Sequence, residues 1–232
     1  VSNFENIISY ENIKVDGIYS HLSTADELNA SHENSYANIQ RRTFLKLLSN
    51  ISIKKYPHIK IHLANSAGTL IGKNFHFDMV RIGLCMYGYK PCKSQNNLKL
   101  KPAMSLKSKV SFVRVVNNNV GVSYGRNFIT SKKTKLGVIS IGYADGIYRT
   151  LSNKISLIHN GKMYPQIGSI TMDQLMIDIT GSNDINVGDT VILLGCDEGK
   201  CISPLDWAEV SSTITWEILC AFKNRLPRVQ IK

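Results

Sequence analysis

The stretch KIHLAN at residues 60–65 is the clearest indication of the fold. It is a short apolar run that enters a polar turn, which is typical of a strand in a parallel sheet. Two further runs, KVDGIYSH at residues 14–21 and DMVRIGL at residues 78–84, predict neighbouring strands. Apolar residues at helical spacing predict a helix over residues 31–50: Tyr36, Ile39, Phe44, Leu47 and Leu48. Strand and helix in alternation predict an α/β fold.

The second half of the chain has a different pattern, with short β-type runs separated by Gly, Asn and Asp turns. This spacing predicts a mainly β, antiparallel domain. A polar link at residues 91–100 separates the halves, so we expect domains at residues 1–97 and 98–232. Ser203 and Asp206 are expected to form a capping box on the first of two closing helices. We expect strands at residues 110–116, 137–141, 155–158, 175–179 and 190–194, and helices at residues 204–210 and 214–222.

The first domain is too short for a complete (βα)8 barrel, which typically needs about 250 residues. It is therefore either a small open α/β domain or the last βα units of a barrel whose front is missing. The chain begins with Val1 rather than Met, and this favours the second interpretation. We accordingly expect a fragment of a longer protein.

Composition indicates a globular protein with a basic surface. Hydrophobic residues make up 43% of the chain and charged residues 19%, and the formal net charge is +11. Because the lysines are scattered rather than clustered, we expect no nucleic-acid partner. No apolar run approaches the ~18 residues of a membrane span, and the N-terminus is too polar for a signal peptide. We therefore expect a cytoplasmic protein with no membrane partner.

The cysteines favour neither a metal site nor a disulfide framework. Their number is odd and no CxxC pair occurs. We therefore expect free thiols and no bound metal. The cysteines are Cys85, Cys92, Cys196, Cys201 and Cys220.

Polar residues follow each of the three strands predicted in the first domain. His21 follows the first, Ser66 the second, and Arg81 and Gly83 close the third. In α/β folds the carboxyl ends of the strands line the site. A serine hydroxyl beside backbone N–H groups can also hold a phosphate. A single histidine in this place is more often a structural residue, and serine and glycine are common in turns. Three polar strand ends in succession nevertheless favour a site.

The β domain contains two tyrosines beside glycines and one polar segment before a strand. Tyr124 lies in VSYGRNF and Tyr143 in IGYADG, where the glycines also fit tight turns. Met172 and Asp173 lie in PQIGSITMDQ, directly before the strand LMIDI. They are either an edge-strand bulge or a substrate contact.

Seven segments, in order from residue 17 to residue 229, resemble the motifs of alanine racemases. One such motif is weak evidence, whereas seven in the family's order are strong evidence. The resemblance implies the C-terminal portion of a (βα)8 barrel that binds pyridoxal 5′-phosphate (PLP), followed by an antiparallel β domain. It also implies a homodimer with shared sites that interconverts L-alanine and D-alanine, supplying D-alanine for cell-wall peptidoglycan. The segments are GIYSHLSTADE, HLANSAG, DMVRIGLCMYG, VSYGRNF, IGYADG, GSITMDQ and TITWEIL…RLPRV.

The resemblance implies cofactor roles for the strand-end residues. Arg81 matches the arginine that bonds the pyridine nitrogen of PLP. Because arginine stays protonated, the ring nitrogen stays unprotonated, which disfavours transamination. Ser66, with the backbone of Gly83 and Leu84, matches the phosphate cradle.

The resemblance also implies catalytic and substrate roles. Tyr124 matches the catalytic tyrosine, which serves one face of the substrate Cα while a lysine serves the other. Its link through His21 to Arg81 is expected to lower its pKa from about 10. Met172, with Asp173, matches the contact to the substrate carboxylate, and Tyr143 matches the inner gate of the entry corridor. The outer corridor residues are Asp26, Arg149 and Ile214.

Three departures from the family pattern qualify this resemblance. No lysine lies in the family's A-x-x-K-A-x-A-Y-G context, so we expect a fragment that lacks the PLP lysine and is inactive alone. Trp216 replaces a phosphate-binding tyrosine. Its indole has a single N–H donor, which either reaches the phosphate with altered geometry or is not used because the side chain packs within the last helix. Ser169 replaces a corridor arginine, which removes a positive charge from the path of an anionic substrate.

Three alternatives remain open on the sequence. One is a related racemase for a larger amino acid, such as serine or lysine, which the changes at Ser169 and Trp216 permit. Another is a non-catalytic remnant or binding module. A basic nucleic-acid-binding protein is the least favoured.

Overall fold

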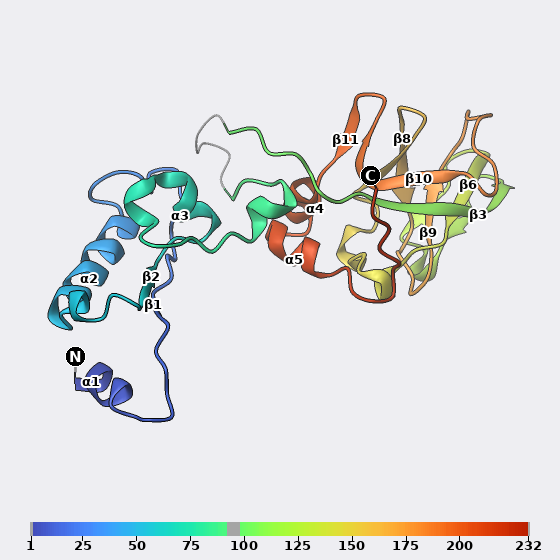
Figure 1. Cartoon of the computed structure of the whole chain (residues 1–232). Coiled ribbons are helices and arrows are strands. Elements are labelled where there is room, and N and C mark those ends of the chain that lie inside the picture. Colours follow the sequence, from blue (N-terminus) through green and yellow to red (C-terminus); the bar gives the residue numbers. More distant parts are fainter. Residues whose placement is uncertain (1, 92–97, 232) are drawn as a thin grey trace. The chain divides into compact units, whose positions relative to one another are not determined.

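The computed structural model describes residues 2–91 and 98–231, and the chain divides into two compact units, Val1–Ala103 and Met104–Lys232 (Figure 1). The expected domain boundary falls at residues 97 and 98, and residue 97 lies outside the described residues. Within the described part of the chain, no helix is long and apolar enough to cross a membrane.

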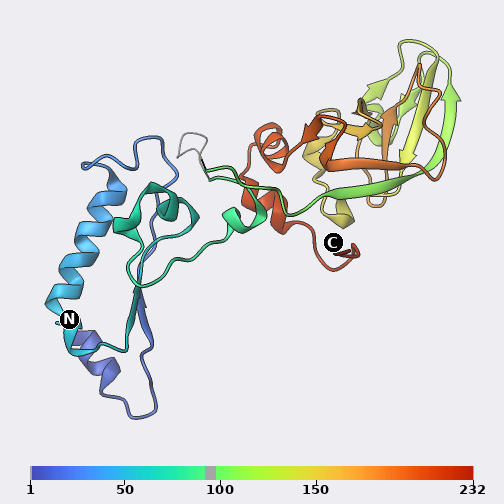
Figure 2. The same cartoon turned by 45° about the horizontal axis from the view of Figure 1, so that its top comes forward.

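The first unit contains the βαβ arrangement that the sequence predicts. Strands β1 (Gly17–Tyr19) and β2 (Lys60–His62) pair in parallel, with Ile18 opposite Ile61. Helix α2 (Tyr36–Asn50) connects them and lies beside the pair in both views (Figures 1 and 2). The helix begins five residues later than expected because Ser35 is its N-cap and accepts a hydrogen bond from the N–H of Asn38.

The core of this unit lies between α2 and the strands. Its apolar side chains are at most 8% exposed: Leu22, Ala37, Phe44, Ile61, Leu63 and Phe75. The shorter helices of the unit are α1 (Ser2–Ile8), α3 (Ser66–Ile71) and the 3₁₀ turns η1 (Ile53–Lys55), η2 (Lys73–Phe75) and η3 (Leu84–Tyr87).

The strand expected at residues 78–84 does not form, and this prediction was wrong. A single parallel bridge joins Met79 to His62. Beyond it the Arg81 N–H still donates to the Ala64 carbonyl, but the N–H of Gly83 donates to the side chain of Ser66. The backbone of Gly83 (φ −114°, ψ −83°) leaves the extended conformation there and enters η3. A side-chain acceptor thus replaces the strand ladder.

The second unit is an antiparallel β barrel, which confirms the predicted mainly β domain. Its strands follow the order β11-β10-β3-β6-β9-β8-β7, and Ile192 of β10 also pairs with Ile158 of β7, so the sheet closes on itself. The closed ring consists of the strands from β10 to β7, and β11 extends it as a hairpin partner of β10. The strands are β3 (Leu106–Val116), β6 (Thr134–Ile139), β7 (Ser156–His159), β8 (Lys162–Ile167), β9 (Leu175–Asp178), β10 (Thr190–Asp197) and β11 (Lys200–Ile202), with the separate hairpin β4 (Gly121–Val122) and β5 (Phe128–Ile129).

Apolar side chains from most barrel strands fill the interior. Those on the strands with no exposed surface include Ile139, Leu157, Ile158, Leu175, Ile177 and Leu193. Strand β8 was not among the expected strands, and its Pro165 is a residue that central strands seldom contain. Pro165 is tolerated because it pairs only with Ser156 on β7, while pairing with β9 starts at Gln166.

Two helices follow the barrel, as the sequence predicts. Helix α4 (Pro204–Val210) begins with the expected capping box, in which Ser203 and Asp206 exchange hydrogen bonds. Helix α5 (Thr215–Cys220) is shorter at both ends than the predicted span 214–222.

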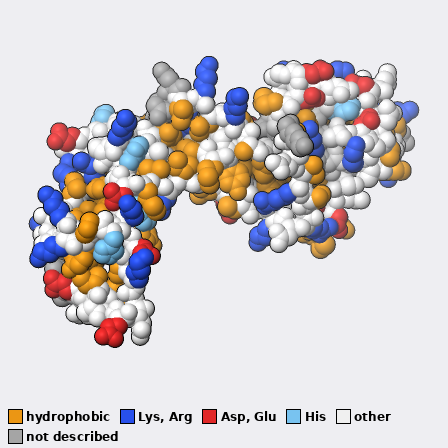
Figure 3. All heavy atoms as spheres, in the orientation of Figure 1, with side chains coloured by type: hydrophobic (Ala, Val, Ile, Leu, Met, Phe, Trp, Pro, Cys, Tyr) orange, Lys and Arg blue, Asp and Glu red, His pale blue; other side chains and the backbone are white. Residues whose placement is uncertain are grey.

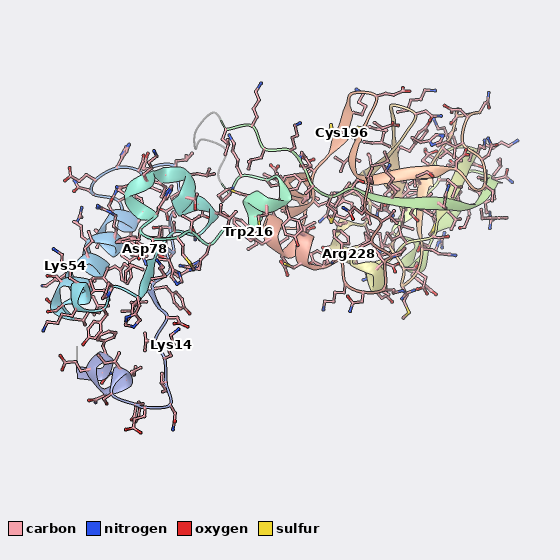
Figure 4. The ribbon with its side chains drawn as sticks, viewed as in Figure 1. Lys14, Lys54, Asp78, Cys196, Trp216 and Arg228 are labelled. Atoms are coloured by element: carbon pink, nitrogen blue, oxygen red, sulfur yellow. A yellow bond between two sulfur atoms is a disulfide. The ribbon has the colours of Figure 1, made fainter. Side chains whose placement is uncertain are left out.

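The expectation of free thiols was wrong for one pair of cysteines. Cys196 and Cys201 form a disulfide (Figure 4). They are directly opposite each other in the β10–β11 hairpin, with Cα atoms 4.1 Å apart, so strand register brings them together. Cys85 and Cys220 are free, and Cys92 lies outside the described residues.

Candidate functional site

Arg81 organises a polar cluster at the ends of β1 and β2. Its Nη1 donates to Nδ1 of His62 at 2.7 Å, and its Nη2 donates to the carbonyl oxygens of Ser20 at 2.8 Å and Leu63 at 3.3 Å. A guanidinium has no acceptor, so Nδ1 of His62 must be unprotonated. Burial, and then the charge of Arg81, lower the pKa of His62, which agrees with a neutral ring.

Tyr19 packs against this pair from within β1. Its ring stacks on His62 with centroids 5.2 Å apart, and the Arg81 guanidinium lies 5.1 Å from its centroid. These contacts fix the plane of the guanidinium. Sequence reasoning missed His62 and Tyr19 as site residues, although both are strand-end residues within the HLANSAG and GIYSHLSTADE segments.

His21 lies between two hydrogen-bond donors. Its Nδ1 is 3.3 Å from Nη2 of Arg81, and its Nε2 is 3.3 Å from the amide nitrogen of Asn65. The Asn65 amide is oriented by its bonds to Gly68 N–H and to the Leu22 carbonyl. A neutral imidazole accepts at only one nitrogen, so only one of the two contacts is a hydrogen bond at a time. The structure thus places two predicted site residues, His21 and Arg81, side by side.

Ser66 forms a cradle with the segment after Arg81. It is 5% exposed, and its Oγ accepts from the N–H of Gly83 at 2.9 Å and, more weakly, of Cys85 at 3.4 Å. Its hydroxyl hydrogen is therefore available to an external acceptor. The N–H of Leu84 donates to no partner among residues 2–91 and 98–231. A Cβ on Gly83 would meet nothing within 4 Å, so an open space adjoins these donors. These features fit a phosphate group.

In the second unit, Tyr124 lies on a strained turn between β4 and β5. Ser123 (φ 63°, ψ −172°) and Arg126 (φ 49°) adopt backbone conformations that non-glycine residues rarely adopt, flanking Gly125 (φ 73°). Such residues cost about 1–3 kcal/mol each and cluster at functional sites. The Tyr124 side chain is 74% exposed. The backbone of the turn, rather than side-chain packing, therefore orients the phenol.

Tyr143 and Met172 lie on two segments that are bonded to each other. The N–H groups of Tyr143 and Ala144 donate to the carbonyls of Thr171 and Met172, at 2.9 and 3.0 Å. A Cβ on Gly142 would collide with the Thr171 carbonyl, so only glycine permits this approach. The N–H of Met172 has no partner within the described part of the chain, and the residue is exposed. An external carboxylate can accept from this N–H.

Arg225 ties the same two segments together through their carboxylates. Its Nε lies 3.0 Å from Oδ1 of buried Asp145, and its Nη2 donates to Oδ1 of Asp173. Asp145 in turn accepts from the N–H of Gly142 at 2.9 Å. The Asp173 carboxylate therefore faces Arg225. Sequence reasoning missed Arg225, whose only signal is its place in the RLPRV segment.

Tyr143 and Arg149 also line a hollow of about 470 Å³ in the second unit. Tyr148 donates to the Glu217 carbonyl at 3.1 Å, and burial, Glu217 and Cys220 raise its pKa. Of the other predicted corridor residues, Ile214 is an exposed N-cap of α5 and Asp26 belongs to the first unit. The hollow is lined by Tyr143, Tyr148, Arg149, Thr150, Ser211, Ser212, Thr213 and Glu217.

The two residues of the second unit that differ from the family pattern, Trp216 and Ser169, have different surroundings. Trp216 is half-buried on α5 (Figure 4), whose buried residues are Thr215, Ile218 and Leu219. Its role at a phosphate stays a prediction. Ser169 is 1% exposed, so its side chain does not line an open corridor.

The basic side chains do not gather into one patch on the visible face of either unit (Figure 3). Among the described residues, no group of three or more His, Cys, Asp or Glu side chains is arranged to hold a metal ion.

Comparisons with known proteins agree over nearly the whole chain. The family model "Alanine racemase, N-terminal domain" matches residues 2–91, and "Alanine racemase, C-terminal domain" matches residues 103–230. An alanine racemase from Prochlorococcus marinus is 52% identical over 222 residues, which are 95% of this chain and 57% of that protein. The chain thus spans little more than half the length of this relative.

Solved structures show the same relationship. A crystal structure of alanine racemase from Bacillus anthracis with bound L-Ala-P matches with a TM-score of 0.89 and 35% identity, over 99% of this chain and 58% of that one. Alanine racemase from Bartonella henselae with covalently bound pyridoxal phosphate matches with a TM-score of 0.83 and 32% identity, over 99% of this chain and 60% of that one.

The fold and the polar strand ends define a two-domain class, part of a parallel α/β barrel followed by an antiparallel β barrel. The matches identify the family within that class. The chain belongs to the alanine racemase family, whose members are isomerases.

Proposed function

We propose that the whole protein interconverts L-alanine and D-alanine with PLP as cofactor, and that the D-alanine serves cell-wall peptidoglycan. The observation that carries the proposal is the cluster around Arg81, held by His62 and two strand-end carbonyls in the same unit as the Ser66 cradle. When bound, PLP withdraws electrons from the amino acid and acidifies its Cα–H bond.

The residues of the first unit would hold the cofactor. The Ser66 hydroxyl and the Leu84 N–H would donate to the phosphate, with the open space at Gly83 admitting it. Arg81 would donate to the pyridine nitrogen and keep that nitrogen unprotonated, because a guanidinium does not give up its proton. The neutral state of His62 leaves the positive charge on Arg81 alone.

The residues of the second unit would act on the substrate. Tyr124 would exchange a proton with Cα on the face used by L-alanine, and His21, a residue of the first unit, would link Tyr124 to Arg81. The free N–H of Met172 would bind the substrate carboxylate, and Tyr143 would gate the entry. Because Arg225 already occupies the Asp173 carboxylate, we propose that Asp173 supports the Met172 segment rather than touching the substrate directly.

The second proton-exchanging group would be a lysine that also holds PLP. No residue of this chain matches the family segment for it. We therefore place it in the part of the relatives' length that this chain does not cover. We further propose a homodimer in which the first unit of one subunit and the second unit of the other form each site.

The experiment that tests the function compares three samples. The whole protein with PLP is expected to racemise alanine, and Tyr124→Phe is expected to reduce kcat by about 10²–10⁴-fold while retaining PLP. This chain alone is expected to show no turnover and to lose PLP absorbance on dialysis. Equal rates for wild type and Tyr124→Phe would remove the catalytic role of Tyr124. Turnover by this chain alone would show that one of its own lysines substitutes.

A racemase for a larger amino acid is the second candidate, and the serine at position 169 favours it. The family usually has a corridor arginine there, and a serine side chain supplies no cation to the path of an anionic substrate. The kcat/KM values for alanine, serine and lysine decide between the two candidates, since specificity is a ratio of these constants.

A further inference from the structure

Ser169 makes three hydrogen bonds to the turn that carries Tyr124. Its hydroxyl donates to the Tyr124 carbonyl at 2.8 Å and accepts from the Asn127 amide at 2.8 Å. Its own carbonyl accepts from the Ser123 hydroxyl at 2.7 Å. One residue thus binds the turn before, at and after the tyrosine.

The turn depends on these bonds because its own conformation is unfavourable. Ser123 and Arg126 both have positive φ, and a strained segment persists only where its surroundings hold it. The Tyr124 side chain is largely exposed and gains little from packing in its own unit. The direction of the phenol is therefore set through the backbone at Ser123 and Tyr124.

Neighbouring residues hold the backbone of Ser169 in place, so its hydrogen bonds can stabilise the conformation of the turn. The residue is 1% exposed, and a Cβ on neighbouring Gly168 would lie 2.6 Å from the Val122 carbonyl, so the two segments are in close contact. Asn153 anchors the segment from the other side, since its Oδ1 accepts from the Gly168 N–H at 2.6 Å. Asn153 also donates to the Asn127 carbonyl at 3.4 Å, so it binds both segments, and the Ile170 N–H donates to the Ser152 hydroxyl at 3.0 Å outside the turn.

Only a hydroxyl matches both partners. The Tyr124 carbonyl requires a donor and the Asn127 amide nitrogen requires an acceptor, and a serine Oγ supplies both at once. A guanidinium, which the family usually has at this position, offers no acceptor to Asn127. Ser169 and Asn127 therefore form a matched pair in this chain.

We propose that Ser169 is a positioning residue for Tyr124, acting through the carbonyl of that tyrosine and through Asn127. The proposal rests on the proposed function, since it assigns what holds the group that exchanges the Cα proton. It replaces the expectation that the serine merely removes a charge from the corridor. A displacement of about 1 Å at a reacting group can reduce the rate by about 10²-fold.

The test uses Ser169→Ala in the whole enzyme with PLP. We expect kcat to fall by roughly 10- to 100-fold while KM for alanine changes less than about threefold, because substrate contacts remain. The α-deuterium isotope effect should change in opposite directions for the two substrates. It should rise with L-alanine, where Tyr124 takes the proton, and fall with D-alanine, where Tyr124 acts only in the later step. A general loss of structure does not produce opposite changes.

Two further variants separate a positioning role of Ser169 from a general effect on folding. Asn127→Ala removes the donor to Ser169 at an exposed residue and should shift the isotope effects in the same directions, less strongly, even if Ser169→Ala fails to fold. Ser182→Ala is the matched control, since Ser182 is also buried, with its hydroxyl bonded to Tyr164 and Asp184. It should leave kcat and both isotope effects unchanged.

The outcomes separate this proposal from the proposed function. If the wild type does not racemise an amino acid, the proposed function fails and this proposal fails with it. If the wild type is active and Tyr124→Phe is fully active, the catalytic role of Tyr124 fails, and this proposal fails with that role. If the wild type is active and Tyr124→Phe is not, while Asn127→Ala and any folded Ser169→Ala keep wild-type kcat and isotope effects, the positioning role alone is overturned.

Discussion

At the scale of single residues, His62 shows how a fixed cation controls the charge of a neighbour. Arg81 donates to its Nδ1, and the ring is 9% exposed, so protonation would place a second positive charge in a poorly solvated site. Burial is the larger cause of the lowered pKa and the charge of Arg81 the smaller. The neutral ring keeps the guanidinium in place.

This makes the stability of the protein depend on pH in a defined direction. The pKa of His62 is about 6.5 in the unfolded chain and lower in the folded chain. Between these two values the unfolded chain binds more protons, so the free energy of unfolding rises with pH. The contribution of His62 is complete above about pH 6.5 and is lost as the pH falls toward the folded value. Chemical denaturation of wild type and His62→Gln across this range measures it.

An NMR titration of the His62 ring checks the cause. Arg81→Gln should raise the pKa of His62 only part of the way to its ordinary value, because burial remains. A pKa of His62 at or above 6.5 in the wild type would contradict the assignment of a neutral ring.

At the scale of elements, Arg225 adds a side-chain connection between two turns that backbone hydrogen bonds already join. Asp145 lies in η5 (Tyr143–Asp145) and Asp173 lies just before β9, and both carboxylates meet the same guanidinium. The Asp173 hydrogen bond and the Asp145 charge raise the pKa of Arg225, so it stays charged. The geometry of Tyr143 and Met172 thus depends on the C-terminal segment.

We expect Arg225→Met to reduce kcat/KM of the whole enzyme by about tenfold, because a buried carboxylate at Asp145 loses its partner and the two turns loosen. Most of the change should lie in KM, since Met172 is the proposed carboxylate contact. Steady-state kinetics measure it. Lys223→Met is the control, since it removes a positive charge from the same segment at an exposed position. Equal effects of the two variants would show that only net charge matters.

At the scale of the whole molecule, the proposed site residues divide between the two units. His21, Ser66 and Arg81 belong to the first unit, and Tyr124 and Met172 to the second. A shared site in a two-fold dimer predicts complementation between differently damaged subunits.

We expect partial recovery of activity when a subunit lacking the cofactor lysine is mixed with a Tyr124→Phe subunit. One of the two sites in each heterodimer would then be intact, so activity should approach about half of the wild-type value per heterodimer. Turnover after co-expression and isolation of the heterodimer by two affinity tags measures this. No recovery in a verified heterodimer would mean that each site is built within one chain.

The sequence alone determined the order of the domains and most of their elements. Strand and helix periodicity predicted the β1–α2–β2 unit, and the spacing of turns predicted the antiparallel strands, because these signals depend on residues close together in the chain. The capping box at Ser203 and the motif order that indicated the family are equally local.

The tertiary structure alone decided which distant groups meet. The turn of residues 78–84 away from the sheet required Ser66 as an alternative acceptor, and the Cys196–Cys201 disulfide required the register of a hairpin. Likewise, the sequence indicates only that Ser169 replaces an arginine, whereas in the fold its hydroxyl donates to the carbonyl of Tyr124, 45 residues away. Such contacts have no periodic signal, because they arise only when chain segments far apart in sequence are packed together.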